Sequence, residues 1–159
     1  MDYAEYVSAR WQTREKFPEL KNQAGNFFKT MDPISDLLNR IRNDQAVLKE
    51  KIELPFSSMK YEIAKILAGK GFVGQVEKRG RKGKKVIEIT LKYEDKVPVI
   101  SGLKRISKPG QRIYAGAGEI KPRARGLGGI VVVSTSQGLM TDKEAKKKGL
   151  GGELICEIW

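Results

Sequence analysis

Small and polar residues, Ser134-Thr135-Ser136-Gln137-Gly138, directly follow the apolar run Ile130–Val133. Hydroxyl and amide groups both donate and accept hydrogen bonds, so without adding charge they can read the base edges and ribose hydroxyls of RNA. The same groups could instead satisfy one another within a tight turn. The segment is therefore a candidate for polar recognition at the point where the chain leaves a strand.

A second segment, Lys108-Pro109-Gly110-Gln111-Arg112-Ile113-Tyr114, combines a rigid turn, two cations and an aromatic ring. Its Pro-Gly pair predicts the turn. Tyr114 could stack on an unpaired base while Lys108 and Arg112 hold phosphates, or it could be a core residue with solvated neighbours. The later stretch from Lys121 to Gly129 adds three cations beside glycines, which permit close approach of a ligand or serve only tight turns.

Two runs of cations could contact phosphates. Residues 78–85 hold six cations in eight positions, Arg81 and Lys82 among them, at the tip of a predicted hairpin. A phosphate backbone would relieve their mutual repulsion, although such runs are also found as solvated loops. Lys146-Lys147-Lys148 ends a predicted helix, where cations offset the helix dipole and can also meet a phosphate.

The overall charge supports binding to a polyanion. The chain has 31 Lys and Arg against 19 Asp and Glu, which gives +12 and a pI near 9.8. A domain this basic is a candidate for nucleic-acid binding. The excess is +1 for residues 1–30 (5 − 4), +4 for residues 31–95 (14 − 10) and +7 for residues 96–159 (12 − 5), so it grows toward the C-terminus.

Several classes of chemistry are unsupported by the sequence. The chain has no His and a single Cys, Cys156, which excludes Ser-His-Asp and Cys-His nucleophilic sites and the usual Cys/His zinc site. Cys156 is expected to pack in the core beside Leu154 and Ile158. Neither a Walker loop nor a dinucleotide fingerprint is present, so we expect no cofactor and no enzymatic activity. Without a signal-peptide core or a membrane-length apolar run, a cytoplasmic protein is expected.

Elements that would position these segments can be predicted from periodicity. Asp32 and Pro33 begin a helix whose apolar stripe runs to about residue 43. A strand at 51–54 follows, then a helix capped by Ser57 or Ser58 with Met59, Ile63, Ile66 and Leu67 on its buried face. Strands at 72–76 and 86–91 complete a helix-strand-helix-strand-strand unit of the α+β class.

The second half is predicted to be mostly β with one short helix. Strands are expected at 103–106, 130–133 and 153–159, and the capping box Thr141–Glu144 begins the helix. We therefore expect an N-terminal extension at residues 1–30, with a short helix near residues 3–11, and two small domains at residues 31–95 and 96–159.

Several stretches occur in the order found in one known family. They are Met31–Asn43, Pro55–Lys60, Arg105–Tyr114, Gly126–Gly128, Val133–Gly138 and Gly149–Glu153. Together they resemble the small-subunit ribosomal protein eight family of bacteria, from about Met31 to Trp159. The chain departs from the family pattern in residues 1–30, which are extra, and in its unusually basic hairpin tip.

The resemblance implies two small α+β domains and primary binding to the central domain of 16S ribosomal RNA, with a role in assembling the platform of the small subunit. It implies that the C-terminal domain binds RNA through Ser134, Thr135, Ser136, Lys108, Tyr114 and Glu153, and that Ser57 and Lys60 match an N-terminal contact region. Implied partners are 16S RNA, neighbouring small-subunit proteins and, in some members, the protein's own operon messenger RNA. The alternatives are an RNA chaperone or an RNA-modifying enzyme with a similar basic surface.

Overall fold

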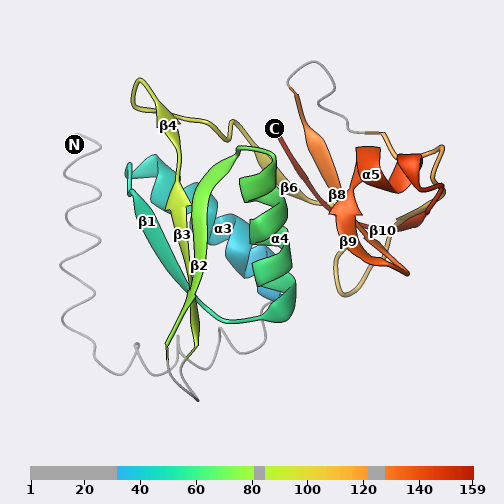
Figure 1. Ribbon diagram of the computed structural model, residues 1–159, viewed down its shortest axis with the longest axis horizontal. Coiled ribbons are helices and arrows are strands. Elements are labelled where there is room, and N and C mark those ends of the chain that lie inside the picture. Colours follow the sequence, from blue (N-terminus) through green and yellow to red (C-terminus); the bar gives the residue numbers. More distant parts are fainter. Residues whose placement is uncertain (1–31, 81–84, 122–127) are drawn as a thin grey trace. The chain divides into compact units, whose positions relative to one another are not determined.

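The computed structural model describes residues 32–80, 85–121 and 128–159, which form helices and antiparallel sheets of the predicted α+β class. Its first elements follow the predicted order (Figure 1). They are α3 (Pro33–Ala46), β1 (Lys51–Pro55), α4 (Ser58–Gly69), β2 (Val73–Arg79) and β3 (Val86–Leu91). The helix expected near residues 3–11 lies outside the described residues.

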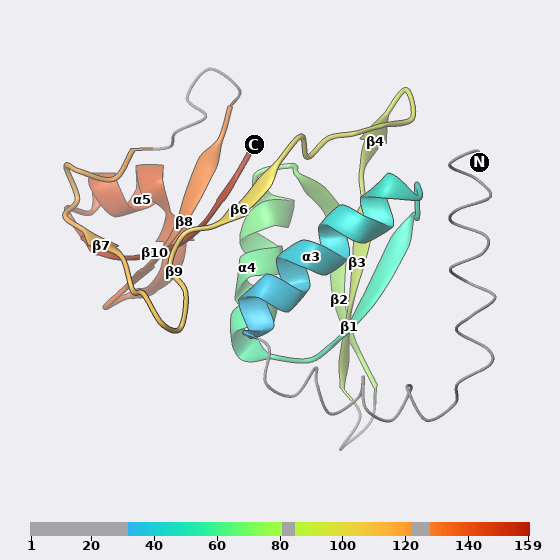
Figure 2. The ribbon, with the colours of Figure 1, turned by 180° about the vertical axis from the view of Figure 1, so that it is seen from behind.

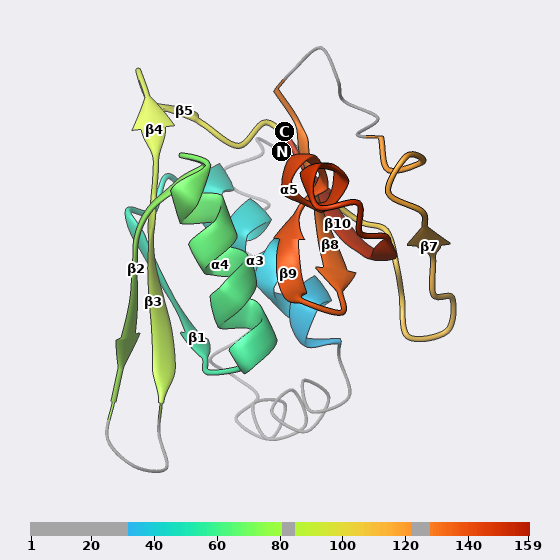
Figure 3. The same ribbon diagram turned by 45° about the vertical axis from the view of Figure 1, so that its right-hand side comes forward.

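Strands β1, β3 and β2 pair in that order as an antiparallel sheet of three strands. Alternate residues of β1 are buried, with Ile52 and Leu54 inside and Lys51, Glu53 and Pro55 exposed. Helices α3 and α4 cover the same face of this sheet (Figures 2 and 3). The alternating burial along β1 therefore places one face of the sheet against the helices.

Helix α3 begins where the sequence predicts. The Asp32 carboxylate accepts a hydrogen bond from the N–H of Ile34 (3.3 Å), and Pro33 occupies the first turn. The predicted stripe of Ile34, Leu37, Leu38 and Ile41 is fully buried, and the helix continues to Ala46. Apolar spacing and a capping residue thus suffice to define this helix.

The buried face of α4 differs from the prediction at Met59, and Ile66 is only partly buried. Ser57 occupies the N-cap position, but its side chain makes no capping hydrogen bond. Ile63 and Leu67 are buried as expected, whereas Met59 is 42% exposed and the prediction for it is wrong. Lys60 is buried instead, because its ammonium pairs with the Asp36 carboxylate of α3.

The second half forms a sheet in the order β6-β10-β8-β9, with β7 also pairing with β10. Its elements are β6 (Leu103–Arg105), β7 (Tyr114–Ala115), β8 (Ile130–Thr135), β9 (Gly138–Thr141), α5 (Asp142–Lys147) and β10 (Gly152–Ile158), and a hairpin of β4 (Tyr93–Glu94) and β5 (Val97–Pro98) precedes them. The predicted capping box is confirmed, since Thr141 and Glu144 exchange hydrogen bonds at the start of α5. Strands β4, β5, β7 and β9 were not predicted.

Two hydrophobic clusters stabilise the described residues. The larger combines the apolar faces of α3, α4 and the first sheet with Leu103, Ile130, Val132 and Ile158 of the second sheet. The smaller one, which includes Val131, Val133 and Ala145, lies between the second sheet and α5. Because the larger cluster draws on both halves, the predicted boundary between residues 95 and 96 stays a prediction.

Candidate nucleic-acid interface

Three of the predicted site residues meet in one row across three strands. Glu153 of β10 pairs with Tyr114 of β7 on one side and with Ser134 of β8 on the other. Directly paired residues of antiparallel strands project on the same face of a sheet. The pairing thus brings together a phenol ring, a carboxylate and a hydroxyl that are far apart in the sequence.

The hydroxyl segment forms the tight turn between β8 and β9, in which Thr135 pairs with Gly138. The Thr135 hydroxyl donates to the carbonyl of Gly138 (2.9 Å) and accepts from the N–H of Gln137 (3.1 Å). Ser136 is exposed, and its side chain makes no hydrogen bond to another described residue. The interpretation as a self-satisfied turn is thus confirmed for Thr135, whereas recognition of RNA by the exposed Ser136 stays a prediction.

A second turn lies directly before Tyr114 in the chain. Lys108 and Gln111 exchange backbone hydrogen bonds of 2.9 and 3.0 Å around Pro109 and Gly110, which confirms the predicted turn. Tyr114 is 70% exposed, so the alternative that it belongs to the core is wrong. Lys108 and Arg112 are exposed as well, which leaves two cations and an aromatic ring accessible near each other along the chain.

Glu153 holds two neighbouring side chains of this surface through its carboxylate. Its carboxylate accepts hydrogen bonds from the Ser107 hydroxyl and from the Arg112 guanidinium (2.8 Å). Ser107 is fully buried and also accepts from the N–H of Ile113 at 3.3 Å. Sequence reasoning assigned no role to Ser107, because a single serine at the end of a strand carries no signal of its burial.

The pKa of the Glu153 carboxyl reflects these contacts. Burial alone would raise the pKa, but the hydrogen bonds from Ser107 and Arg112 outweigh burial and lower the pKa below its ordinary value. Glu153 is therefore an anion at neutral pH that fixes the position of Arg112.

A comparison with known protein families covers the part of the chain that forms this surface. The family model described as "Ribosomal protein S8" matches residues 32–159. The chain belongs to the ribosomal protein S8 family. It is 55% identical over 131 residues to the small ribosomal subunit protein uS8 of Caldanaerobacter subterraneus subsp. tengcongensis, which covers 80% of this chain and 97% of the relative. The uS8 proteins of Halalkalibacterium halodurans and Staphylococcus epidermidis (strain ATCC 35984) are 54% and 51% identical over 129 residues, with the same coverage.

Membership in the S8 family makes the chain a structural, non-enzymatic ribosomal protein, located on the ribosome in the cytoplasm. The alternative of an RNA-modifying enzyme loses its support with this finding. Within the described ranges, no helix is long and apolar enough to span a membrane. Residues 1–31 lie outside the part of the chain that the S8 family model matches.

The two residues predicted as N-terminal contacts, Ser57 and Lys60, lie on or next to α4 and outside the row of Tyr114, Glu153 and Ser134. Ser57 is half-buried at the N-cap, with a hydroxyl that does not cap the helix. The ammonium of Lys60 is buried against Asp36. We therefore assign Lys60 to the packing of α3 against α4 and leave it out of the interface.

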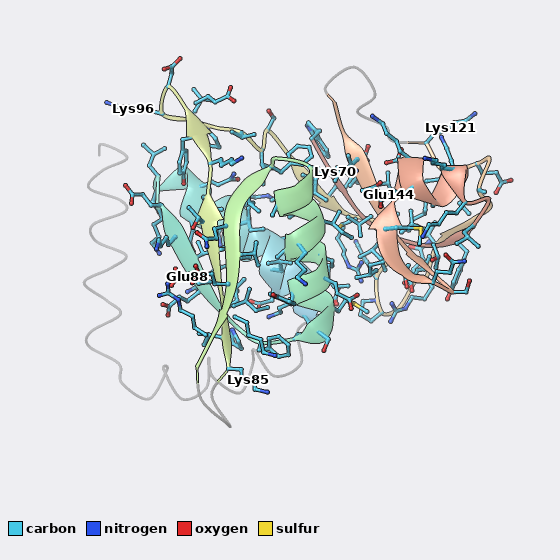
Figure 4. All side chains as sticks on the ribbon, in the orientation of Figure 1. Lys70, Lys85, Glu88, Lys96, Lys121 and Glu144 are labelled. Carbon is cyan, nitrogen blue, oxygen red and sulfur yellow. The ribbon has the colours of Figure 1, made fainter. Side chains whose placement is uncertain are left out.

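The basic hairpin tip is only partly described. Arg81 and Lys82, and residues 122–127 of the glycine-rich stretch, lie outside the described residues. At the flanks of the tip, the Lys78 ammonium lies 4.5 Å from the centre of the Phe56 ring, and Arg79 pairs with Glu88 at 2.9 Å. Lys85 is exposed and projects from the far end of this hairpin (Figure 4). The phosphate contacts predicted for Arg81 and Lys82 stay a prediction.

The three lysines at the end of α5 have roles within the protein that need no RNA. Lys146 and Lys147 occupy the last turn of the helix, where they offset its dipole. The Lys148 ammonium donates to the side-chain carbonyl of Gln137 at 3.3 Å. This contact joins the end of α5 to the turn that carries Ser136. Lys148 therefore helps to hold that turn in place.

Replacing Glu153 with glutamine should cost stability in a pH-dependent way. A carboxyl whose pKa is lowered by folding stabilises the protein above its unfolded pKa, near 4.5, and loses that contribution as the pH falls through the folded value. The loss caused by Glu153→Gln is thus expected to be largest at about pH 7 and to shrink as the pH falls below about 4.5. Urea unfolding of the unmodified protein and of Glu153→Gln across this pH range measures the lost stability. A loss independent of pH would contradict the role assigned to the Glu153 carboxylate.

Proposed function

We propose that this chain is a structural constituent of the small ribosomal subunit that binds the central domain of 16S ribosomal RNA and helps to assemble the subunit platform. The observation that carries the proposal is the row of Tyr114, Glu153 and Ser134, with Ser136 exposed on the adjoining turn. The relatives named uS8 are small-subunit proteins, which supports the same assignment.

Each exposed group of this surface has a distinct part in the proposed binding. Lys108 and Arg112 supply phosphate contacts, which give affinity without sequence information. The Tyr114 ring supplies a stacking platform for a base that has left its helix. The Ser136 hydroxyl can donate to or accept from a base edge or a ribose hydroxyl. Such a combination suits an irregular RNA stem better than a regular duplex.

Two of the predicted residues act indirectly in this proposal. Glu153 is an anion that would repel phosphate, yet it holds Arg112 and Ser107 in place. Thr135 uses its hydroxyl to close the turn that presents Ser136.

Ser57 is kept as a contact from the N-terminal half, because its hydroxyl does not cap α4. Neighbouring small-subunit proteins and the protein's own operon messenger RNA are further proposed partners.

Substitutions at the exposed groups test the proposal. Tyr114→Ala and Ser136→Ala are each expected to weaken binding to a central-domain RNA fragment by about 1–3 kcal/mol, through a lost base stack and a lost hydrogen bond. Filter binding at a fixed salt concentration measures the change.

Matched variants separate these effects from general damage. Tyr114→Phe keeps the ring and should retain the stacking contribution, and Ser101→Ala removes an exposed serine outside the surface. If Tyr114→Ala and Ser136→Ala bound the fragment as tightly as the unmodified protein, the assignment of this surface would be wrong. Absence of the protein from purified small subunits would contradict the function itself.

A further inference from the structure

A cavity of about 290 Å³ lies between α3 and β6, the first strand of the second sheet. Asn39 and Arg42 line it from α3, and Lys104 and Arg105 line it from β6. Lys108, from the turn that precedes Tyr114, completes this part of the lining. The cavity is thus formed by residues that the sequence separates by more than sixty positions and that the fold brings together.

The charged residues of the described chain that line this cavity are all basic. The positive charge of Arg105 is neutralised by Asp32, because its guanidinium lies 2.8 Å from the Asp32 carboxylate. The guanidinium also donates a hydrogen bond to the carbonyl of Ile155 at 2.6 Å. Arg42, Lys104 and Lys108 have no carboxylate partner among the described residues. Three uncompensated cations therefore remain at the cavity, a density that attracts an anion.

Arg42 is held in a position to meet such an anion. Its guanidinium reaches from α3 to the β6 backbone and donates a hydrogen bond to the carbonyl of Leu103. An arginine has five N–H donors in a fixed plane, so this single bond leaves the others for a second acceptor. The exposed amide of Asn39, one turn earlier on α3, adds a neutral donor and acceptor at the same cavity.

We propose that this cavity holds a backbone phosphate of the bound RNA, as a second point of contact beyond the row of Tyr114, Glu153 and Ser134. The inference rests on the proposed function. A volume near the lower end of ligand pockets suits a phosphodiester group better than a folded partner segment. Lys108 belongs both to the cavity and to the turn that supports Tyr114, so one RNA strand can follow from one contact to the other.

The consequence for recognition is that both halves of the chain contact the RNA, the first through α3 and the second through its sheet. Phosphate contacts fix the position and register of a nucleic acid, whereas groups such as Tyr114 and Ser136 read its shape. A phosphate at α3 would set the angle at which the RNA crosses the C-terminal surface. The first half of the chain would then contribute directly to orientation, through Arg42 and Asn39.

Charge variants at Asn39 test the inference without removing an existing contact. Asn39 is exposed, and its side chain makes no hydrogen bond to another described residue, so lysine and glutamate both fit the helix. Asn39→Lys should strengthen binding of the central-domain RNA about five-fold and Asn39→Glu should weaken it about five-fold, the effect of one charge pair at close range in water. Asn39→Lys should also steepen the dependence of log Kd on log salt by up to about 0.9.

Gln75 of β2 provides the matched control, because it is exposed, neutral and outside the cavity. Gln75→Lys and Gln75→Glu change the net charge of the protein by the same amounts, so they report only long-range attraction. Larger and opposite effects at Asn39 than at Gln75 would support the phosphate site. Thermal unfolding of all four variants verifies that they remain folded.

Equal effects at the two positions, while Tyr114→Ala still weakens binding, would overturn the cavity inference and leave the proposed function intact. If the unmodified protein did not bind the central-domain RNA, both would fail. If the Asn39 variants altered incorporation into small subunits but not affinity for the RNA, an acidic protein segment would be the occupant, and the inference would again be wrong.

Discussion

Gly152→Ala is expected to lower the free energy of unfolding by about 3 kcal/mol, at the upper end of the usual cost of overpacking. A Cβ atom on Gly152 would lie 2.0 Å from the carbonyl oxygen of Ser134 and 2.9 Å from its carbonyl carbon. These are backbone atoms of β8, which cannot rotate away as a side chain can. The clash must separate β10 from β8 or distort both strands. Urea unfolding monitored by circular dichroism measures the change.

Gly118→Ala is the matched control, because a Cβ atom there meets no atom within 4 Å. Its effect should stay within about 0.5 kcal/mol, as for most surface substitutions. Gly152→Ala should also weaken RNA binding, since the separation displaces Ser134 and Glu153 from their row. A Gly152→Ala protein as stable as the Gly118→Ala protein would show that the close approach of β10 to β8 is not required.

Asp36→Ala should destabilise the protein by about 3–5 kcal/mol, because it leaves a buried charge without a partner. The side chain of Lys60 is only 6% exposed, and its ammonium donates to the Asp36 carboxylate across the contact between α4 and α3. Removal of the carboxylate leaves the buried ammonium without this partner. Chemical unfolding measures the loss.

Two comparisons identify the cause of that loss. Replacing both partners, Asp36→Leu with Lys60→Met, removes the unpaired charge and should recover most of the stability. Lys70→Ala breaks the exposed pair of Lys70 and Glu144, whose atoms lie 2.8 Å apart, and should cost at most about 1 kcal/mol (Figure 4). Equal losses for Asp36→Ala and Lys70→Ala would mean that the burial of Lys60 has no energetic consequence.

Lys60 also illustrates where prediction of the fold from sequence ends. The stripe of α3 is predictable because apolar spacing alone determines which face of a helix is buried. On α4 the same reasoning selected Met59, because no local pattern indicates that Lys60 would find an anion 24 residues away on another helix. Burial of a charge depends on tertiary pairing, which a single sequence does not display.

The short strands were missed for a related reason. β7 has two residues and β9 has four, too few for an alternating pattern to rise above its surroundings. Their extended conformation comes from pairing, of β7 with β10 and of β9 with β8, which a local pattern does not display. The longer strands β8 and β10 were predictable from an apolar run and from alternation.

For the candidate interface, the sequence identified the kinds of residue but not how they meet. The turn at Pro109 and Gly110 follows from local composition, whereas the sequence left open whether Tyr114 is exposed or belongs to the core. The register that aligns Tyr114, Glu153 and Ser134 depends on strand pairing, and so does the burial of Ser107 beneath them. Local sequence thus suggests ligand chemistry, whereas strand register determines which groups share a face.

The position of Cys156 makes its thiol a natural reporter of the detachment of β10 from the second sheet. This sole cysteine of the chain is fully buried in β10, which pairs with β6 and β8, and burial raises the pKa of its thiol to about 12. Alkylating reagents attack the thiolate, so Cys156 is protected while β10 stays in the sheet. The rate of alkylation of the purified protein therefore follows the detachment of this strand from the sheet.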